Sequence, residues 1–389
     1  MPTDQGEIKY IAVLGATGNQ GGGVVRALLA KTEPSFHVRA ITRDVSSPAA
    51  QRLQAKYKDS GRLEFVAADV YNKQSLIEAF QNVYGVFAVT NNRIAGKKIE
   101  KEQDMDHELV AGRNIIDAAK ACNVQHFVMS SLPNITNASK GRFTKVFHFD
   151  NKHKIEQRAR DELLAVTALH PGLFYTNMQW SQYCQRQDDG TVRFCAPIDG
   201  NKLADWVDPS YDIGVYAAEI FSLGPEKTAA KTYPVVGPKL SFADFARVFR
   251  EITSQEATFD PITLDQWGAT VAATVGKGYE EDIKQMMEWI AVAPDDKICY
   301  GTRDQTEDTS YEDLRVKAST LADWMRRTAW QGPQTGPNGG RWFGLSLPDR
   351  KSTKEKGVAK PDPTRIYLMG DPCTSPSIRS SPNGFVRTR

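Results

Sequence analysis

Three glycines, in Gly15-Ala-Thr-Gly18-Asn-Gln-Gly21, follow an apolar run at residues 10–14 and precede a stripe of apolar residues at helical spacing, 24–29. A strand, a turn without side chains and a helix start let the backbone approach a pyrophosphate, whose charge faces the free amides of the helix. The alternative is a tight turn that binds nothing. In this context the motif predicts a dinucleotide site at the beginning of an α/β fold.

Apolar or β-branched runs alternate with segments of helical period as far as residue 169. We expect strands at 10–14, 37–42, 63–67, 85–90, 126–130 and 166–169, and helices at 49–58, 74–80, 102–122 and 152–164. The nearly all-apolar first run suits a strand that is covered on both faces. The alternation predicts a Rossmann-type doubly wound parallel sheet over residues 8–170.

The pattern changes after His170. Aromatic residues stand in a loop-rich stretch, followed by a predicted short strand at 232–236 and predicted helices at 241–251, 264–275, 280–292 and 311–327. We expect residues 171–330 to form a smaller, mostly helical substrate or partner lobe that is interleaved with the sheet. Residues 331–389 hold 8 of the 20 prolines and carry a net charge of +6, so we expect a disordered basic tail.

Composition excludes several classes of protein. The net charge of +2 gives no sign of direct nucleic-acid or membrane binding. The five cysteines lack a C-x-x-C pair, and the histidines lack metal-ligand spacing, so we expect a reducing compartment and no metal site. No secretory signal or membrane span is recognisable, and we expect a cytoplasmic protein, with access to the nucleus left open.

Cofactor choice is expected to depend on the end of the second strand. Arg43 follows the third glycine by 22 residues, where a basic side chain accepts a 2′-phosphate and an acidic one binds a 2′-hydroxyl. The planar guanidinium suits a phosphate, which favours NADP(H). Asp44 stands next to it and leaves NAD as the alternative.

Polar residues also follow the third and fourth strands. Asp69 and Val70 are expected on the adenine side of a dinucleotide, although Asp69 could equally cap a helix. Thr90, Asn91 and Asn92 lie where the carboxyl edge of the sheet binds ligands, or they form a plain turn.

Taken together, the glycine loop, Thr42-Arg43, Val89-Thr-Asn91 and above all His148-Phe-Asp-Asn-Lys152 resemble the NmrA-like branch of the atypical short-chain dehydrogenases/reductases. The resemblance covers roughly residues 8–327, with weaker matches at Trp206-Val-Asp208 and Asp212-Ile-Gly214. It implies an NADP(H)-binding Rossmann domain with a smaller C-terminal lobe. Some members are reductases, and others are redox-sensing regulators that bind a protein.

The resemblance also implies roles for single residues. Active relatives place a tyrosine four residues before the lysine, whereas this chain has His148 before Lys152. Lys152 should bond the nicotinamide ribose, and His148 is either the proton donor or a plain cleft residue. Ser130 and Ser131 occupy the region of a catalytic serine, and Tyr175 is a candidate replacement acid.

Two functions remain open at this stage. The first is an NADP-dependent oxidoreductase acting on a small, partly aromatic carbonyl or alkene. The second is a catalytically silent NADP(H) sensor that regulates a transcription factor or another protein partner. In both, the expected cofactor contacts are Gly15, Ala16, Thr17, Gly18, Asn19, Gln20, Gly21, Arg43, Ser47, Asp69, Val70, Thr90, Asn91, Asn92, Lys152, Phe174, Tyr175, Thr176 and Asn177.

Overall fold

A parallel sheet organises the computed structural model, which describes residues 9–94 and 96–333. Seven of the described strands join in the order β12-β6-β5-β4-β1-β2-β3, and every neighbouring pair is parallel. Their bounds are β1 Lys9–Val13, β2 Phe36–Thr42, β3 Leu63–Ala67, β4 Gly85–Val89, β5 His126–Ser130, β6 Val166–Pro171 and β12 Thr232–Val235. The order reverses between β1 and β4, which confirms the predicted doubly wound arrangement.

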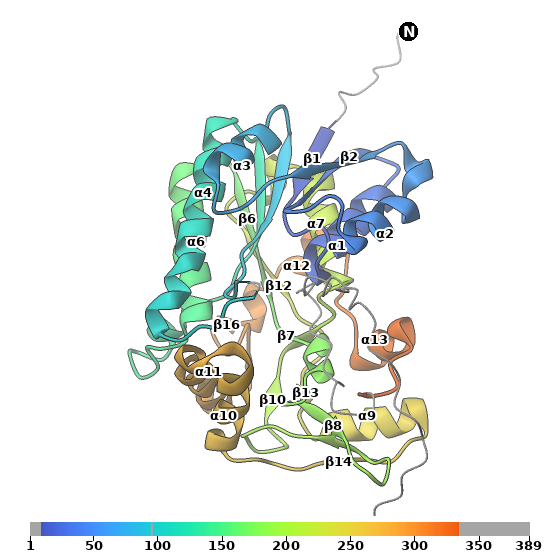
Figure 1. Ribbon diagram of the computed structural model, residues 1–389, viewed down its shortest axis with the longest axis vertical. Coiled ribbons are helices and arrows are strands. Elements are labelled where there is room, and N and C mark those ends of the chain that lie inside the picture. Colours follow the sequence, from blue (N-terminus) through green and yellow to red (C-terminus); the bar gives the residue numbers. More distant parts are fainter. Residues whose placement is uncertain (1–8, 95, 334–389) are drawn as a thin grey trace, which may run out of the picture. The chain divides into compact units, whose positions relative to one another are not determined.

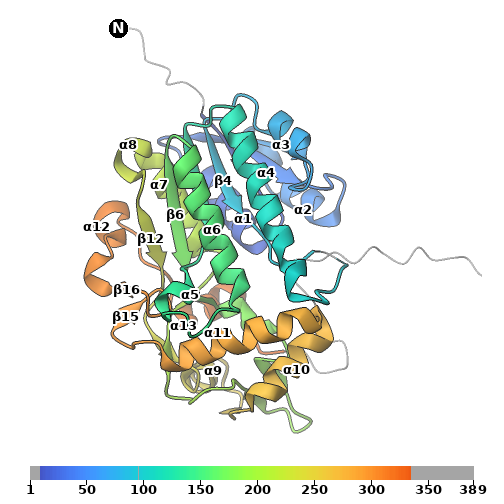
Figure 2. The same ribbon diagram turned by 90° about the vertical axis from the view of Figure 1, so that its left-hand side faces the viewer.

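Helices cover both faces of this sheet (Figure 1, Figure 2). One face carries α1 Asn19–Ala30, α2 Pro48–Lys56 and α7 Asp212–Leu223, and the other carries α3 Lys73–Ala79, α4 His107–Ala121 and α6 Phe147–Glu162. Helices α1 and α7 touch through glycine: a Cβ on Gly23 would lie 2.6 Å from the Ser210 carbonyl oxygen, and one on Gly214 would overlap the backbone of Gly23. This close contact fixes the position of α1, whose first turn faces the site.

Two elements from the second half of the chain belong to the sheet. The strand predicted at 232–236 is the edge strand β12, which pairs with β6. Helix α7 was not predicted, because its residues 213–221 are apolar on nearly every side and show no one-sided stripe. It packs beside α1 on the sheet, and only a narrow side of the helix, at residues 215, 219, 222 and 223, is partly exposed. The expected boundary at residue 170 is therefore crossed by these two elements.

Most of the remaining elements lie beyond the carboxyl ends of the strands, around one large apolar core (Figure 1). The helices of this core are α5 Ile135–Ala138, α9 Asp244–Thr253, α10 Leu264–Val275, α11 Glu280–Val292 and α13 Leu321–Thr328. Helix α12 Ser310–Leu314 packs instead on α7 and β12, and the short α8 Pro225–Thr228 precedes β12 at the amino ends of the strands. Small sheets combine β7 Leu173–Phe174 with β11 Trp206–Val207, β8 Cys184–Arg186 and β14 Ala257–Phe259 with β9 Val192–Phe194, β10 Leu203–Ala204 with β13 Leu240–Ser241, and β15 Lys297–Ile298 with β16 Arg303–Asp304. Short 3₁₀ turns are η1 Lys58–Ser60, η2 Glu102–Asp106, η3 Tyr175–Gln179, η4 Lys277–Tyr279 and η5 Gln305–Glu307.

The helix predicted at 311–327 is interrupted. Arg315 has a φ of +58°, which ends α12, and α13 starts six residues later. Between them Ser319 donates from its amide and its hydroxyl to Asp212 at 3.0 and 2.6 Å. Arg327 in turn donates to Ser319 at 2.9 Å and pairs with the buried Asp208. This polar cluster holds α13 against the start of α7.

The described chain ends on the small three-stranded sheet, where Arg186 donates to the carbonyl oxygens of Gln331 and Pro333 at 2.6 and 3.0 Å. The rest of the predicted tail, 334–389, lies outside the described residues. Of the helices described, none is long and apolar enough to cross a membrane.

Candidate cofactor and substrate cavity

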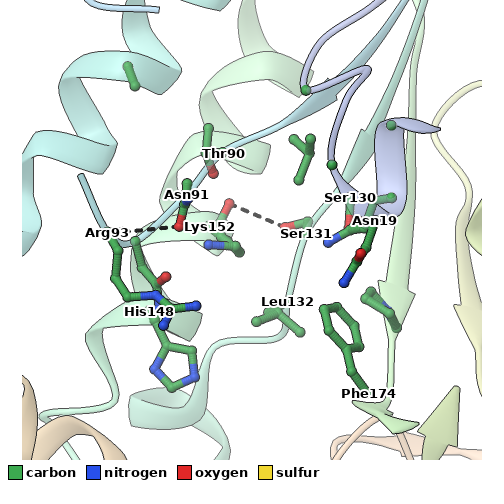
Figure 3. A pocket seen from close by; sticks show the side chains of 18 of the residues that line it. Asn19, Thr90, Asn91, Arg93, Ser130, Ser131, Leu132, His148, Lys152 and Phe174 are labelled. Atoms are coloured by element: carbon green, nitrogen blue, oxygen red, sulfur yellow. Dashed lines mark hydrogen bonds between the residues drawn. The ribbon is translucent and has the colours of Figure 1, made fainter. Parts of the chain in front are cut away.

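A cavity of about 500 Å³ opens at the carboxyl edge of the sheet, where the first strands meet the helices of the C-terminal core. Figure 3 shows side chains from β4, β5, α1 and α6 converging on it. It brings together most of the predicted site, namely Gly15, Thr17, Gly18, Asn19, Gln20, Gly21, Arg43, Val70, Thr90, Asn91, Asn92, Ser130, Ser131, His148, Lys152, Phe174 and Asn177.

The glycine turn forms one end of the cavity. Gly15 has a φ of +63°, and a Cβ on Gly21 would overlap the Gly15 carbonyl oxygen, so both positions need glycine. Helix α1 begins at Asn19 without a side-chain cap and without an acidic residue in its first turn. Its amides are therefore available to an anion. The side-chain oxygen of Gln20 is buried there and accepts no hydrogen bond from a described residue.

Ala16 is the exception within the loop. Its amide donates to the Ile41 carbonyl oxygen at 3.4 Å, and its side chain is fully buried. Ala16 is therefore part of the packing between β1 and β2 and does not line the cavity, contrary to its predicted role as a cofactor contact.

Arg43 and Asp44 are neighbours in the chain, but only Arg43 lines the cavity. Arg43 lines the cavity, and its side chain makes no ion pair or hydrogen bond within residues 9–94 and 96–333. Asp44 instead accepts from the amide and hydroxyl of Ser46 at 2.8 and 2.6 Å, and these bonds lower the pKa of the Asp44 carboxyl. Ser47 caps α2 by accepting from the Ala50 amide. Asp44 and Ser47 thus make hydrogen bonds within the loop and at the start of α2, and neither lines the cavity.

After β3, Val70 lines the cavity but Asp69 does not. The Asp69 carboxylate accepts from the Tyr71 amide at 2.9 Å, while Asn72 caps the following helix. Asp69 therefore closes a turn, which corresponds to neither of its two predicted roles.

A buried carboxylate supports the middle of the cavity wall. Glu108 on α4 is fully buried, pairs with the ammonium of Lys152 and accepts from the Thr90 hydroxyl at 2.6 Å. Its second oxygen is buried and has no hydrogen-bond partner among the described residues. The sequence reasoning missed Glu108, although it stands at the first position of the apolar stripe of α4, where a carboxylate is unusual.

Two serines lie at the carboxyl end of β5, where Ser130 is the last residue of the strand and Ser131 follows it. Both line the cavity (Figure 3). The Ser131 hydroxyl donates to the Lys152 carbonyl oxygen at 3.2 Å, which ties β5 to α6. Next to them Leu132, which was not predicted, contributes an apolar wall.

His148 and Lys152 lie one helical turn apart on α6, and both line the cavity, as their spacing implies (Figure 3). His148 is bound by a second carboxylate that was not predicted. Asp282 on α11 accepts from the His148 amide at 2.9 Å and pairs with its Nδ1 atom. Asp282 is fully buried.

The loop after β6 is divided between cavity and core. Phe174 and Asn177 line the cavity, whereas Tyr175 and Thr176 do not. Tyr175 is 1% exposed, stacks on Trp206 at 6.2 Å and donates to the Ser319 carbonyl oxygen at 3.2 Å. Burial raises the pKa of its hydroxyl. This placement does not support Tyr175 as a replacement acid or as a cofactor contact.

The end of the cavity away from the glycine turn is apolar and aromatic. Its walls come from the loops after β5 and β6 and from α10, η4 and α11, with the side chains of Leu132, Trp180, Tyr183, Val271, Val275, Tyr279, Ile283, Met286 and Tyr300. The guanidinium of Arg93 stands over the Trp180 ring at 5.0 Å. Asn92 donates to the Tyr279 hydroxyl. Such walls suit an apolar body with few polar groups.

The charges around the cavity have one sign. Among the described residues that line it, the charged groups are Arg43, Arg93 and Lys152, with His148 as a further basic side chain and no carboxylate. The two carboxylates next to it, Glu108 and Asp282, are fully buried behind the wall. Within the described chain no group of three or more His, Cys, Asp or Glu side chains is arranged to hold a metal ion.

Known proteins resemble this chain in sequence. A family model described as the NmrA-like family matches residues 7–325. An NmrA-like family domain-containing oxidoreductase of Malbranchea aurantiaca, malD, is 32% identical over 269 residues, which span 67% of this chain and 76% of that protein. Another oxidoreductase of the same description, hkm9 of Aspergillus hancockii, is 30% identical over 289 residues, or 72% of this chain and 81% of that protein.

Solved structures resemble it in fold. NmrA, described as a negative transcriptional regulator and solved in complex with NADP, aligns with a TM-score of 0.64 at 21% identity over 82% of this chain and 95% of its own. An NADPH-dependent quinone oxidoreductase of Escherichia coli, QOR2, solved with NADPH, aligns with a TM-score of 0.61 at 20% identity over 83% of this chain and 100% of its own.

Proposed function

This chain belongs to the NmrA-like family, and we propose that it is an NADP(H)-dependent oxidoreductase that transfers a hydride to or from an apolar, ring-bearing organic substrate. The observation that carries the proposal is a single cavity with an uncapped helix start and Arg43 at one end and aromatic walls at the other.

The residues present fit a dinucleotide. The glycine turn leaves room for a pyrophosphate, and the first amides of α1 supply donors and a favourable dipole. The buried oxygen of Gln20 lacks a partner in the described chain, as expected next to a ligand that donates a hydrogen bond. Lys152, at the middle of the wall, is the residue that would bond the nicotinamide ribose.

Two observations favour the phosphorylated dinucleotide. The Arg43 guanidinium faces the cavity without a described counter-charge, and its planar donors suit a 2′-phosphate. Asp44, the residue that could have bound a 2′-hydroxyl, is engaged by Ser46.

The names of relatives agree with redox chemistry. Curated relatives, such as malD and hkm9, are named oxidoreductases. QOR2 is described as an NADPH-dependent quinone oxidoreductase, and a further neighbour is a triphenylmethane reductase of a Citrobacter species complexed with NADP(H). Both of these neighbours are described as acting on ring compounds, which matches the aromatic end of the present cavity.

When bound, the cofactor would supply or accept a hydride at its nicotinamide ring. The chain's own residues would do the rest. Lys152 and the loop at Phe174 would orient the ring, and the apolar walls around Ile283 and Met286 would exclude water. A substrate with a carbonyl or a conjugated alkene on a flat apolar body would fit between them.

Calorimetric titration with NADPH and NADH tests the cofactor assignment. We expect tighter binding of NADPH, and we expect Arg43→Ala to weaken NADPH by roughly 10- to 100-fold, about 1.4 to 2.8 kcal/mol, with little change for NADH. Arg113→Ala, at an exposed position on α4, serves as the matched control. Absence of heat with either dinucleotide would refute the proposal, and equal losses for both would refute the role of Arg43.

A second candidate function, the silent NADP(H) sensor, rests on one feature of the site. The Lys152 ammonium is paired with Glu108, and no tyrosine stands one turn before it. NmrA itself is described as a negative transcriptional regulator. Incubation with NADPH and a panel of aldehydes, quinones and enones separates the two functions, since a sensor consumes no NADPH. Capture of protein partners with and without NADP would then have to give different profiles.

A further inference from the structure

Asp282 contacts His148 through both of its carboxylate oxygens. One oxygen accepts from the His148 backbone amide at 2.9 Å, and the other pairs with the ring at Nδ1. The two residues come from different parts of the fold, the start of α6 and the first turn of α11, so the contact joins the sheet domain to the helices that form the apolar end of the cavity.

Both side chains of this contact are buried or nearly so, which restricts where the shared hydrogen can lie. Asp282 is fully buried, and only 12% of the His148 side chain is exposed. A buried carboxylate is costly unless it is hydrogen-bonded, and both of the bonds found here are made to one residue. Because a carboxylate oxygen can only accept, the hydrogen between Asp282 and His148 lies on Nδ1.

The second ring nitrogen of His148, Nε2, is free to contact a ligand in the cavity. His148 lines the cavity, and its Nε2 atom has no hydrogen bond to a described residue. The charged or titratable groups around it are Lys152 on the next turn of α6, Tyr279 of η4 with its ring 5.9 Å away, and Arg93 after β4 (Figure 3). None of these provides a second carboxylate.

From this geometry we infer that Asp282 is a positioning residue that fixes the His148 ring with a proton on Nδ1, so that Nε2 exchanges a proton with the substrate. The inference rests on the proposed function. It assigns to His148 and Asp282 together the proton transfer that a tyrosine performs in other short-chain dehydrogenases/reductases.

The step is balanced for reduction of a carbonyl. A hydride from the reduced nicotinamide forms the new C–H bond, and the carbonyl π electrons move to oxygen. The ring begins this step protonated at both nitrogens, and its Nε2–H bond breaks as the proton passes to that oxygen, which gives an alcohol and oxidised cofactor. The ring, now neutral and still protonated at Nδ1, regains a proton at Nε2 from solvent, so that one solvent proton is consumed for each alcohol formed. Oxidation of the alcohol runs through the same steps in reverse.

Two other hydroxyls in the cavity, those of Tyr279 and Ser131, are less suited to this role. The Tyr279 hydroxyl accepts from Asn92, and burial raises its pKa well above the usual range. The Ser131 hydroxyl is used by the Lys152 carbonyl oxygen. Tyr279 nevertheless lines the cavity, so Tyr279→Phe belongs in the test as the rival donor.

Asp282→Asn is the sharpest variant, because the amide keeps one oxygen for the His148 backbone. The amide nitrogen then faces Nδ1 and donates to it, which moves the ring proton to Nε2 and removes the charge that supports a protonated ring. Nitrogen-15 NMR of the histidine ring in the free protein should show Nδ1–H in the wild type and Nε2–H in Asp282→Asn. The same tautomer in both proteins would overturn the inference without touching the proposed function.

Kinetics with NADPH and 9,10-phenanthrenequinone as the probe provides the second readout. We expect His148→Gln and Asp282→Asn to lower kcat by roughly 100-fold or more, with the pH dependence flattened and with KM and NADPH affinity nearly unchanged. Glu288→Gln, an exposed position on the same helix, should match the wild type. Loss of kcat in Tyr279→Phe but not in Asp282→Asn would overturn the inference.

Two further outcomes separate the hypotheses. A wild type that binds no NADPH would remove the proposed function, whereas one that binds NADPH but reduces neither this quinone nor other quinones, aldehydes and enones would overturn the proton-transfer role. Thermal melting of each variant shows whether the substitution has destabilised the fold. If Asp282→Asn does not fold, His148→Gln still decides between His148 and Tyr279 as the donor.

Discussion

Lys152 and Glu108 form a buried ion pair across the cavity wall, from α6 to α4. The same Glu108 oxygen accepts from the Thr90 hydroxyl at 2.6 Å, so three secondary-structure elements meet at one atom. This contact links the residue expected to bond the nicotinamide ribose to the end of β4, and it makes the wall both charged and tightly held.

Removing one partner of this pair should be costly. Glu108→Gln leaves the Lys152 ammonium without its counter-charge, and we expect the free energy of unfolding to fall by about 3 kcal/mol. Lys152→Met should lower the free energy of unfolding by a similar amount, because it leaves the buried Glu108 carboxylate without a counter-charge. Urea denaturation of both variants and of the double variant measures the coupling. Strictly additive losses would contradict the pairing.

The glycine turn can be tested at two neighbouring positions. Gly21→Ala places a Cβ on the Gly15 backbone, so we expect the turn to shift, a loss of roughly 1 to 3 kcal/mol of stability and at least a tenfold loss of NADPH affinity. Gly22→Ala meets the Ala16 carbonyl oxygen at 3.3 Å, and we expect a change within about 1 kcal/mol and nearly normal binding. Melting curves and calorimetry compare the two variants, and equal behaviour would contradict the steric argument.

His126 should make the folded protein sensitive to acid. Burial, with a smaller effect of the Lys9 charge, lowers the pKa of His126 to about 4. The unfolded chain takes up this proton near pH 6.5, so stability falls as the pH drops from about 6.5 to about 4, by at most about 3 kcal/mol from this group. The free energy of unfolding, measured near pH 6.5 and near pH 4, should fall more steeply with decreasing pH in the wild type than in His126→Gln. Parallel pH profiles would be inconsistent with a buried neutral ring.

Arg327 is expected to hold α13 in place. It pairs with the buried Asp208, donates to Ser319 at 2.9 Å and stands over the Tyr211 ring at 3.7 Å. Arg327→Met leaves the buried Asp208 carboxylate without its counter-charge. We expect the free energy of unfolding to fall by about 3 kcal/mol and the amides of α13 to exchange faster. Arg327→Lys should recover only part of this, because a lysine cannot make both bonds of the planar fork. Hydrogen exchange followed by mass spectrometry measures the effect, and unchanged exchange in α13 would rule it out.

Local patterns in the sequence were sufficient for much of the fold. The six strands before residue 170 follow from short apolar runs, and the helices α10 and α11 follow from apolar residues at helical spacing. Helix α7 escaped prediction because its sequence is apolar on nearly every side. The break before Ser319 escaped it because the bonds to Asp212 span 107 residues of sequence.

The residues of the site also fall into those with a local sequence signal and those without one. The glycine turn, Arg43 and the spacing of His148 and Lys152 are local signals, and the cavity contains all of them. Glu108 and Asp282 have their meaning only through partners that are 44 and 134 residues away in the chain. A carboxylate on a helix normally indicates a solvated face, and only the apolar stripe around each of these two suggested otherwise. Tyr175 and Ser47 looked functional by position, but the fold directs them to the core and to a helix cap.

The division of the cavity between two parts of the chain has a consequence for substitutions. Its nucleotide end is made by turns of the sheet that tolerate little change, since glycines there touch backbone. Its opposite end is made in part by side chains of α10 and α11, such as Val275, Ile283 and Met286, which can change in size while the sheet stays intact. Substitutions in these two helices are therefore expected to change the shape of the apolar end while leaving the glycine turn in place.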